Sequence, residues 1–137
     1  MGAIVAATMS ICKSGDLIIV NSGIYGATYE FFNVDMRRLG ADVILEDVFD
    51  VNVLEKILKD VSGYQRYMEN DTSQRKVMVF LESITNPLVK VANILCIAET
   101  CKKYGATLVV DNTMATPLRM KPILEVSLIC LMIIFLQ

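Results

Sequence analysis

Three apolar runs of this sequence lead to polar residues that could do chemistry on a bound ligand. The runs are LIIV at 17–20, VMVFLE at 77–82 and TLVVD at 107–111. Asn21 follows the first run, and Glu82 and Asp111 close the other two. If the runs are neighbouring parallel strands, these groups meet at one edge of the sheet. Ligands of open α/β sheets bind beyond the carboxyl ends of the strands, so Asp111 lies where chemistry is expected.

The elements that must position these residues alternate between helix and strand along the chain. This alternation is typical of an α/β fold, with a mostly parallel sheet and helices on both faces. The predicted strands are 17–20, 41–46, 77–82 and 107–111, and the predicted helices are 3–13, 26–39, 51–58 and 91–103. Asp50 is a candidate N-cap for the third helix. The polar segment 60–76 is expected to be a surface connection.

The composition fits a single domain with one core. The chain has 137 residues, of which 54% are hydrophobic and 20% are charged, and its formal net charge is −2. A chain of this length can bury roughly two-thirds of the surface that it exposes when extended. The hydrophobic content argues against disorder, and the lack of a basic stripe argues against a nucleic-acid partner.

Cysteine and histidine usage narrows the chemistry further. The four cysteines are Cys12, Cys96, Cys101 and Cys130. They form no tight CxxC pair, so neither a disulfide framework nor a thiolate metal site is favoured. A reduced, cytoplasmic setting is the simpler expectation. Histidine is absent, which excludes Ser-His-Asp and Cys-His catalysis and histidine-ligated zinc.

The end of the sequence, VSLICLMIIFL at 126–136, is apolar but short. A helix needs about 20 apolar residues to span a bilayer, so a membrane anchor is disfavoured. A buried strand is the ordinary interpretation of such a run, and a misread or frame-shifted end is a third. The expected organisation is a domain over 1–125 followed by a divergent apolar tail over 126–137.

Three motifs follow one another along the chain: IYGATY at 24–29, LESITNP at 81–87 and VVDNT at 109–113. Together they resemble the pyridoxal-phosphate enzymes of cysteine and methionine metabolism, the group of cystathionine γ-synthase, cystathionine γ-lyase and methionine γ-lyase. The resemblance runs from Met1 to about Glu125. It implies part of the large domain of a fold type I, aspartate aminotransferase-like enzyme. It also implies pyridoxal 5'-phosphate as cofactor, cystathionine or methionine as the kind of substrate, and assembly as a homotetramer.

The resemblance further implies roles for residues in the three motifs. Asp111 would pair with the protonated ring nitrogen of the cofactor, and Asn86 would bond its phenolic oxygen. Tyr25 would stack on the ring and help to move a proton at the leaving group, which makes it the predicted catalytic residue. Glu82 would lie near the cofactor, and Thr113 would support Asp111 or the ring. These are the groups that a planar pyridine cofactor requires.

Each of these residues also has an ordinary structural interpretation. Asp111 is equally suited to a helix cap or a turn after a strand, and Thr113 could bond the backbone. A tyrosine before glycine, such as Tyr25, is often an amphipathic surface residue. Asn86 before proline marks a turn. The second tyrosine of the first motif, Tyr29, is expected in the core.

The first residues of the chain match another part of the family pattern. Met1 and Gly2 correspond to the end of the glycine turn that binds the cofactor phosphate, where backbone N–H groups and a helix N-terminus hold the anion. The Ser-Gly that precedes this position in the family has no counterpart here, because the given sequence starts at Met1. Met1 and Gly2 are therefore expected to supply only part of the phosphate site.

The resemblance stops after KPILE at 121–125. In the family, the lysine that carries the cofactor as a Schiff base lies shortly beyond this point, as does the domain whose arginine binds the substrate carboxylate. No lysine follows Lys121. The expected function is therefore that of a fragment of a transsulfuration-type lyase or synthase, inactive alone. A non-catalytic cofactor-binding or interaction subunit is the alternative. A nucleotide-binding Rossmann module is disfavoured because no GxGxxG or P-loop motif follows a predicted strand.

Overall fold

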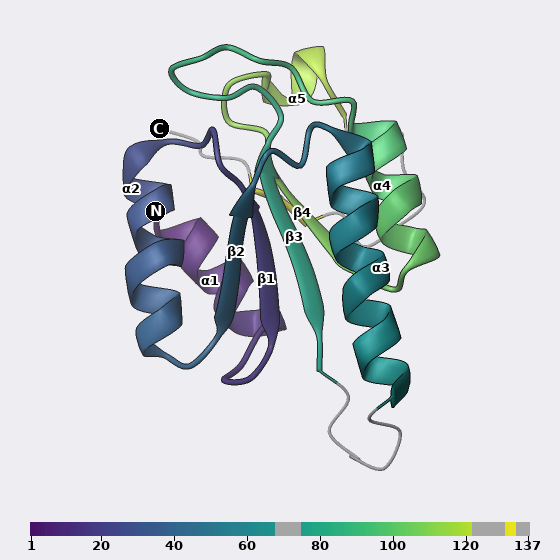
Figure 1. The fold of residues 1–137 in the computed structure, drawn as a ribbon. Coiled ribbons are helices and arrows are strands. Elements are labelled where there is room, and N and C mark those ends of the chain that lie inside the picture. The colour runs from purple at the N-terminus through teal and green to yellow at the C-terminus, as the bar shows by residue number, and fades with distance from the viewer. Residues whose placement is uncertain (68–74, 122–130, 134–137) are drawn as a thin grey trace.

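A five-stranded parallel sheet forms the centre of the molecule (Figure 1). The computed structural model describes residues 1–67, 75–121 and 131–133. The strands are β1 (Leu17–Asn21), β2 (Asp42–Glu46), β3 (Val77–Glu82), β4 (Thr107–Asp111) and β5 (Leu131–Ile133), in the order β2-β1-β3-β4-β5. Every pairing between neighbours is parallel. The predicted α/β class and the parallel sheet are confirmed.

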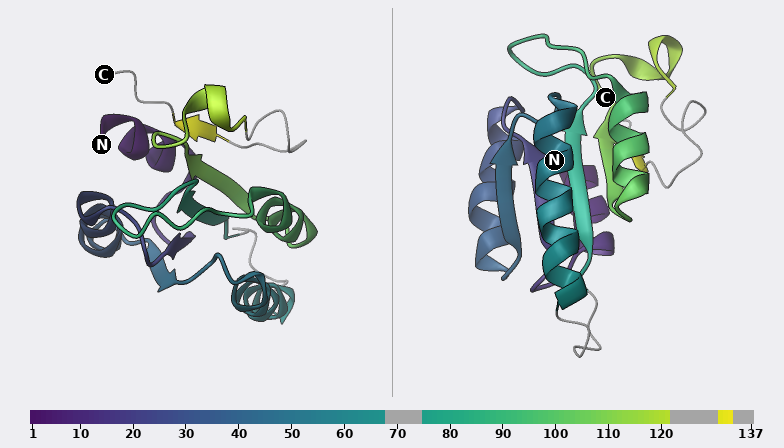
Figure 2. Two further views of the ribbon diagram at one scale, coloured as in Figure 1. Left: turned by 90° about the horizontal axis from the view of Figure 1, so that it is seen from above. Right: turned by 45° about the vertical axis from the view of Figure 1, so that its right-hand side comes forward.

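Helices cover both faces of the sheet. They are α1 (Gly2–Ile11), α2 (Gly26–Glu30), the π-helical segment η1 (Phe31–Met36), α3 (Val51–Tyr67), α4 (Ile94–Lys103) and α5 (Thr116–Arg119). Seen from above, α1 and α2 lie on one side of the strands, and α3 and α4 lie on the other (Figure 2). Because both faces are covered, all residues of β1 and β3 are buried, as is typical of parallel sheets.

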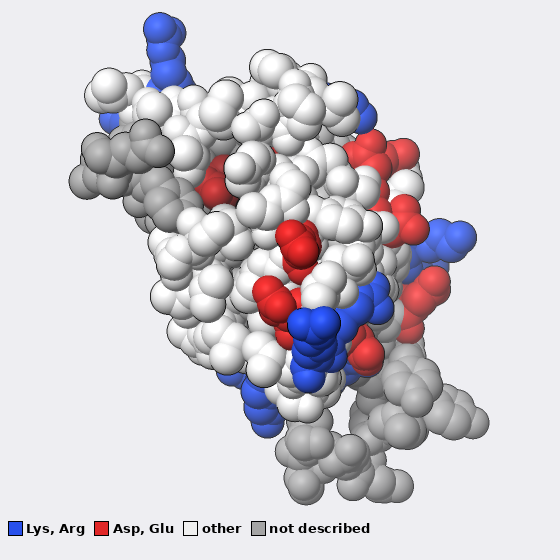
Figure 3. Space-filling model, turned by 90° about the vertical axis from the view of Figure 1, so that its left-hand side faces the viewer, with Lys and Arg blue, Asp and Glu red and all other residues white. Residues whose placement is uncertain are grey.

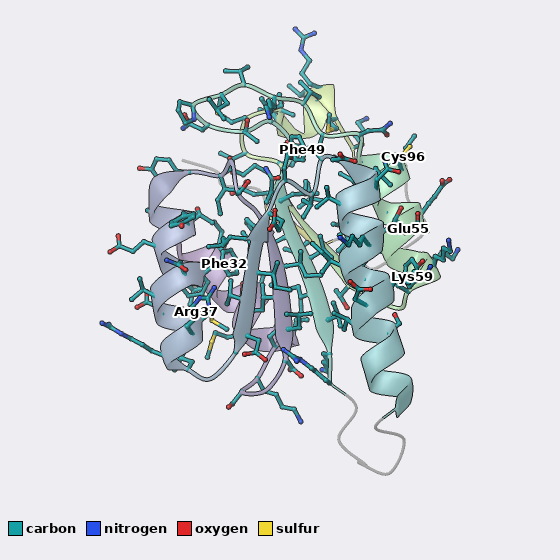
Figure 4. All side chains as sticks on the ribbon, in the orientation of Figure 1. Phe32, Arg37, Phe49, Glu55, Lys59 and Cys96 are labelled. Atoms are coloured by element: carbon teal, nitrogen blue, oxygen red, sulfur yellow. The ribbon has the colours of Figure 1, made fainter. Side chains whose placement is uncertain are left out.

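Alternate side chains of each strand therefore enter two separate cores. Ile18 and Val20 of β1 pack on the α1 and α2 side, whereas Leu17 and Ile19 pack on the α3 and α4 side. The first core is centred on Phe32 of η1 (Figure 4), whose ring centroid lies 4.8 Å from that of Phe80 in β3. This period of two decides which polar residues at the strand ends share a face.

The helix predicted over 26–39 is present as α2 followed directly by η1, and it ends at Arg38. Gly40 comes two residues later with a φ of +86°, a conformation that suits glycine. A Cβ atom at Gly40 would also collide with the side chain of Ser14. Gly40 thus allows the sharp turn that returns the chain to the sheet.

The third helix is longer than the sequence indicated. It was expected over 51–58, with a surface connection from 60, but α3 continues to Tyr67. The expectation was wrong over 60–67 because Val61 continues the apolar face of Leu54 and Leu58 at helical spacing, and packs against the same core. The rest of that connection, 68–74, lies outside the described residues.

Smaller differences arise at the ends of other elements. α1 stops at Ile11, because Cys12 is already extended. The helix predicted to begin at 91 begins at Ile94, because the side chain of Asn93 caps it by accepting a hydrogen bond from the backbone N–H of Cys96 (3.3 Å). Asp50 accepts from the backbone N–H of Asn52 (2.9 Å), in agreement with its predicted cap role.

Part of the apolar tail joins the sheet. β5 pairs with β4, with Leu131 opposite Val109 and Ile133 opposite Asp111. This agrees with the interpretation of the tail as a strand; residues 122–130 and 134–137 lie outside the described part. No helix among the described residues is both long and apolar enough to cross a membrane.

The two helices on the second face are tied together at their outer surfaces. Glu55 of α3 accepts hydrogen bonds from the Nζ of Lys103 (2.6 Å) and from the hydroxyl of Tyr104 (3.1 Å), and Figure 4 shows Glu55 on α3. These bonds lower the pKa of Glu55 and raise that of Lys103. Both charged groups lie at the surface, so the pair contributes little to stability.

Candidate active site at the carboxyl edge of the sheet

The carboxyl ends of β1, β3 and β4 lie side by side, because these strands are neighbours in the sheet. This confirms the expectation that the strand ends meet at one edge. Glu82 and Asp111 are register partners, and both share the face of Phe80 and Val109 by strand alternation. Asn21 points to the opposite face, where its Oδ1 accepts a hydrogen bond from the backbone N–H of Val48 (3.1 Å). Only two of the three polar ends therefore face one site.

A cleft of about 610 Å³ opens beside Glu82 and Asp111 on the side of α1 and α2. Its lining residues are Met1, Ile4, Tyr25, Thr28, Glu82, Ile84, Asn86, Asp111, Thr113 and Met114. Six of the seven residues predicted for the site are in this list. Figure 3 shows a recessed patch of acidic atoms in an otherwise uncharged part of this side, while other charged side chains stand out lower down and along the right edge. No lysine or arginine of the described part of the chain lines the cleft.

Tyr25 lies at the mouth of the cleft, where it is the N-cap residue of α2. Its side chain is 51% exposed, and its backbone N–H donates to Oε1 of Glu82 (2.9 Å). Tyr29 was expected in the core, but it is 39% exposed. The helix turns Thr28 and Phe32 inward instead, since they lie four residues apart on one face.

Glu82 is held by two backbone groups and is only 6% exposed. Oε1 accepts from Tyr25, and Oε2 accepts from the backbone N–H of Asn86 (3.1 Å). Burial raises the pKa of Glu82, and the nearby charge of Asp111 adds to the increase, although the two hydrogen bonds partly oppose it. The side chain therefore joins the end of β3 to two loops.

Asp111 is 8% exposed at the floor of the cleft. Its Oδ1 accepts hydrogen bonds from both the backbone N–H (2.9 Å) and the hydroxyl of Thr113. Its Oδ2 accepts none from the described residues. The turn role proposed for Asp111 thus occupies one oxygen and leaves the other to a ligand, so the structural and functional interpretations are compatible.

Asn86 belongs to a loop that leaves β3 and returns to α4. The loop is closed by hydrogen bonds from Ala92 N–H to Ser83 O (2.9 Å) and from Thr85 N–H to Lys90 O (2.9 Å). The peptide bond between Asn86 and Pro87 is cis, in line with the turn predicted there. The loop places Asn86 in the lining of the cleft, beside Glu82.

The remaining predicted residues lie at the start of α1. Met1 lines the cleft, and its sulfur accepts a hydrogen bond from the hydroxyl of Thr28 (3.8 Å). Gly2 is the first residue of α1 and is exposed, but it is not part of the lining. The N-terminal end of α1 therefore faces the cleft, and free backbone N–H groups at such an end attract anions.

Sequence reasoning missed several residues of this region. Thr28 lies inside the IYGATY motif, four residues before Phe32, and this helical spacing could have signalled an inward side chain. Asn112 is fully buried and its Nδ2 donates to the backbone O of Met120 (2.9 Å), which fixes the chain after Asp111. Ile84 and Met114 carry no local signal for the site, since apolar residues in loops are common.

The described cysteines form no part of the cleft. Cys12, Cys96 and Cys101 are free thiols. Burial raises the pKa of Cys12 to about 11, so its thiol stays protonated at neutral pH. The residues that the structure describes contain no group of three or more His, Cys, Asp or Glu side chains placed to hold a metal ion.

Pyridoxal-phosphate-dependent fold type I enzymes share this layered sheet. A solved structure with this fold is that of a putative O-acetylhomoserine (thiol)-lyase from Campylobacter jejuni, described with N'-pyridoxyl-lysine-5'-monophosphate. It superposes with a TM-score of 0.74 at 27% identity, covering 90% of this chain and 27% of that one. The implied fold type is therefore confirmed.

The chain belongs to the Cys/Met metabolism PLP-dependent enzyme family, which residues 1–128 match. It is 34% identical over 121 residues to a cystathionine γ-synthase/O-acetylhomoserine (thiol)-lyase from Bacillus subtilis, covering 88% of this chain and 29% of the relative. It is 31% identical over 123 residues to an O-succinylhomoserine sulfhydrylase from Pseudomonas aeruginosa, with 90% and 27% covered. The chain thus spans less than a third of the length of these relatives, and the resemblance to the family is confirmed.

Proposed function

We propose that this chain forms part of the cofactor-binding domain of a transsulfuration-type lyase or synthase that acts on sulfur amino acids. The observation that carries the proposal is the position of Asp111. Its carboxylate lies at the floor of a cleft, with one oxygen held by Thr113 and the other available. A buried carboxylate in this arrangement suits a protonated heterocyclic nitrogen.

The other lining groups suit pyridoxal phosphate. Tyr25 offers an exposed ring on which a pyridine can stack. Asn86 offers an amide for the phenolic oxygen, and the N-terminus of α1 offers backbone N–H groups for the phosphate. The volume of about 610 Å³ is within the ordinary range for a site that binds a small molecule.

Bound pyridoxal phosphate supplies an electron sink for a carbanion at the substrate α-carbon. Two residues of the chain, Asp111 and Tyr25, would support this chemistry. Asp111 would keep the proton on the ring nitrogen, because its negative charge lies in a site with little exposure to water. Tyr25, whose hydroxyl is both donor and acceptor, would orient the ring and pass a proton near the leaving group.

The positions of the lysines limit the chemistry that this polypeptide can do alone. No lysine of the described residues lines the cleft, and the sequence has none after Lys121. We therefore propose that the 137-residue polypeptide alone holds the cofactor without a covalent link and has little activity. A described cleft lining without a lysine is also what the second candidate requires, a non-catalytic subunit that binds the cofactor or a longer relative.

The cellular location and the oligomeric state are further parts of this proposal. Three free cysteines support a reduced, cytoplasmic location. Exposed apolar side chains on the loop of Asn86 and on α5, including Leu88, Val89 and Leu118, support association into a homo-oligomer such as a tetramer. No nucleic-acid or membrane partner is proposed.

Titration of the chain with pyridoxal phosphate, followed by cofactor absorbance and fluorescence, tests the proposal. The wild-type chain is expected to bind, and Asp111→Asn is expected to bind at least about ten-fold more weakly because the pairing charge is lost. Asp60→Asn, on the exposed surface of α3, is the matched control and should bind as wild type does. Equal affinity of Asp111→Asn and Asp60→Asn would contradict the proposal.

A further inference from the structure

Two loops of the cleft converge on one side chain of the sheet. The first joins β1 to α2 and carries Tyr25, and the second follows β3 and carries Asn86. The backbone N–H of each residue donates to the carboxylate of Glu82, at 2.9 Å to Oε1 and 3.1 Å to Oε2. Tyr25 lies 57 positions from Glu82 in sequence. A single buried carboxylate therefore bonds to the backbone of both loops.

Glu82 and Asp111 differ in what their oxygens do, although they are register neighbours. Both oxygens of Glu82 are occupied by backbone donors, and an ionised carboxylate has no hydrogen to donate. Asp111 keeps Oδ2 without a donor from the described residues. Glu82 thus bonds the backbone around the cleft, whereas Asp111 has an oxygen available to a ligand.

We propose that Glu82 is a positioning residue, which fixes Tyr25 and Asn86 relative to Asp111, rather than a contact of the cofactor. Its importance for cofactor binding rests on the proposed function, but the two hydrogen bonds do not. The backbone bonds that close the second loop, from Ala92 to Ser83 and from Thr85 to Lys90, do not reach Tyr25, whereas Glu82 bonds to both loops. Register pairing with β4 then transmits the position of Glu82 to Asp111.

Amide hydrogen exchange, resolved by NMR for each residue of the whole chain, tests the anchor without any cofactor. In Glu82→Ala, the amides of Tyr25 and Asn86 are expected to exchange at least about ten-fold faster than in wild type, because both acceptors are lost. The amide of Val79 in β3 should stay protected if the fold is kept. Glu46→Gln, at the exposed end of β2, is the matched control and should alter neither loop amide.

Glu82→Gln provides a second variant that retains the size of the side chain. Its amide keeps one acceptor oxygen and turns a donor toward the other N–H. Protection is expected to return at one of the two amides and to stay low at the other, a pattern that general unfolding would not give. If neither amide of Glu82→Gln exchanges faster than in Glu46→Gln, the anchor is refuted, whether or not Glu82→Ala folds.

Cofactor titration of the same variants separates this inference from the proposed function. Where wild type binds pyridoxal phosphate, Glu82→Gln should bind it about ten-fold more weakly, and Glu46→Gln should bind it equally. Equal affinity of wild type and Glu82→Gln would overturn the positioning role. If wild type takes up no cofactor, the proposed function fails, and the exchange of the two amides alone decides whether Glu82 anchors the loops.

Discussion

Glu82 and Asp111 are opposite each other in the register of β3 and β4, and both carboxylates face the α1 and α2 side of the sheet. Two buried acids on neighbouring parallel strands would repel each other, and this repulsion adds to the effect of burial on the pKa of Glu82. Hydrogen bonds from Tyr25 and Asn86 to Glu82, and from Thr113 to Asp111, offset part of that cost. The arrangement concentrates negative charge where a protonated ring would bind.

The raised pKa of Glu82 predicts a pH-dependent difference in stability between wild type and Glu82→Gln. Between the unfolded pKa, about 4.3, and the higher folded pKa, the native state binds more protons than the unfolded state. Wild type should therefore gain stability relative to Glu82→Gln as the pH falls from 7 through this window. Urea unfolding of both chains at pH 7, 6 and 5 measures the change. A difference that is constant with pH, or that moves the other way, would contradict the assigned direction.

Removal of the central aromatic ring of the first core should destabilise the chain strongly. Phe32 is fully buried and touches Phe80, so Phe32→Ala is expected to lower the free energy of unfolding by about 3–5 kcal/mol. Tyr29→Ala, three residues earlier in the chain, should cost far less because Tyr29 is 39% exposed. Denaturant unfolding measures both, and a comparable loss in the two variants would mean that the inward face of the helix is assigned wrongly.

Substitution of Asn21 should lower the stability of the chain and leave its affinity for the cofactor unchanged, in contrast to substitution of Asp111. Asn21→Ala removes one of the two acceptors of the buried backbone N–H of Val48, which keeps its bond to the backbone O of Glu46 (2.9 Å), and should cost about 0.5–1.5 kcal/mol. Its side chain faces away from the cleft, so the affinity for pyridoxal phosphate should not change. A weaker affinity in chains that are still folded at the assay temperature would show that Asn21 belongs to the site.

The chain by itself should release little or no 2-oxo acid from L-methionine or cystathionine in the presence of pyridoxal phosphate, since no described lysine lines the cleft. Coupled detection of the 2-oxo acid with a dehydrogenase measures this. Asp111→Asn serves as the control for contaminating enzymes, because a contaminant would act equally in both preparations. Rapid release by wild type that Asp111→Asn abolishes would show that the chain is an active enzyme.

Association of the chain should depend on the apolar residues at the carboxyl edge. Leu118 on α5 is almost fully exposed, so Leu118→Ser is expected to shift light scattering toward the mass of one chain. Leu39→Ser removes an exposed leucine after η1 and should leave the mass unchanged. A wild-type chain that is already monodisperse and monomeric would refute the association.

The sequence was sufficient to predict most of the elements and the site residues that meet. Alternation of apolar runs with helical segments predicted the parallel sheet, and the three motifs predicted that Tyr25, Asn86 and Asp111 share one edge. The predictions from sequence were wrong where the local pattern is weak. Polar residues after Leu58 resemble a loop, yet they continue a helix because Val61 reaches the core. An aromatic residue such as Tyr29 looks suited to burial, but the phase of the helix exposes it.

The sequence by itself determined the chemistry available at the strand ends, since the residue types that follow each apolar run are local properties. Tertiary structure alone decided how these groups are used. The phase of β1 turns Asn21 to the far face, and the register of β3 on β4 sets Glu82 beside Asp111. The return of two loops to one carboxylate depends on contacts between segments up to 57 positions apart, which no local pattern encodes. Glu82 therefore looks like a cofactor ligand in sequence but holds the backbone of two loops in the folded chain.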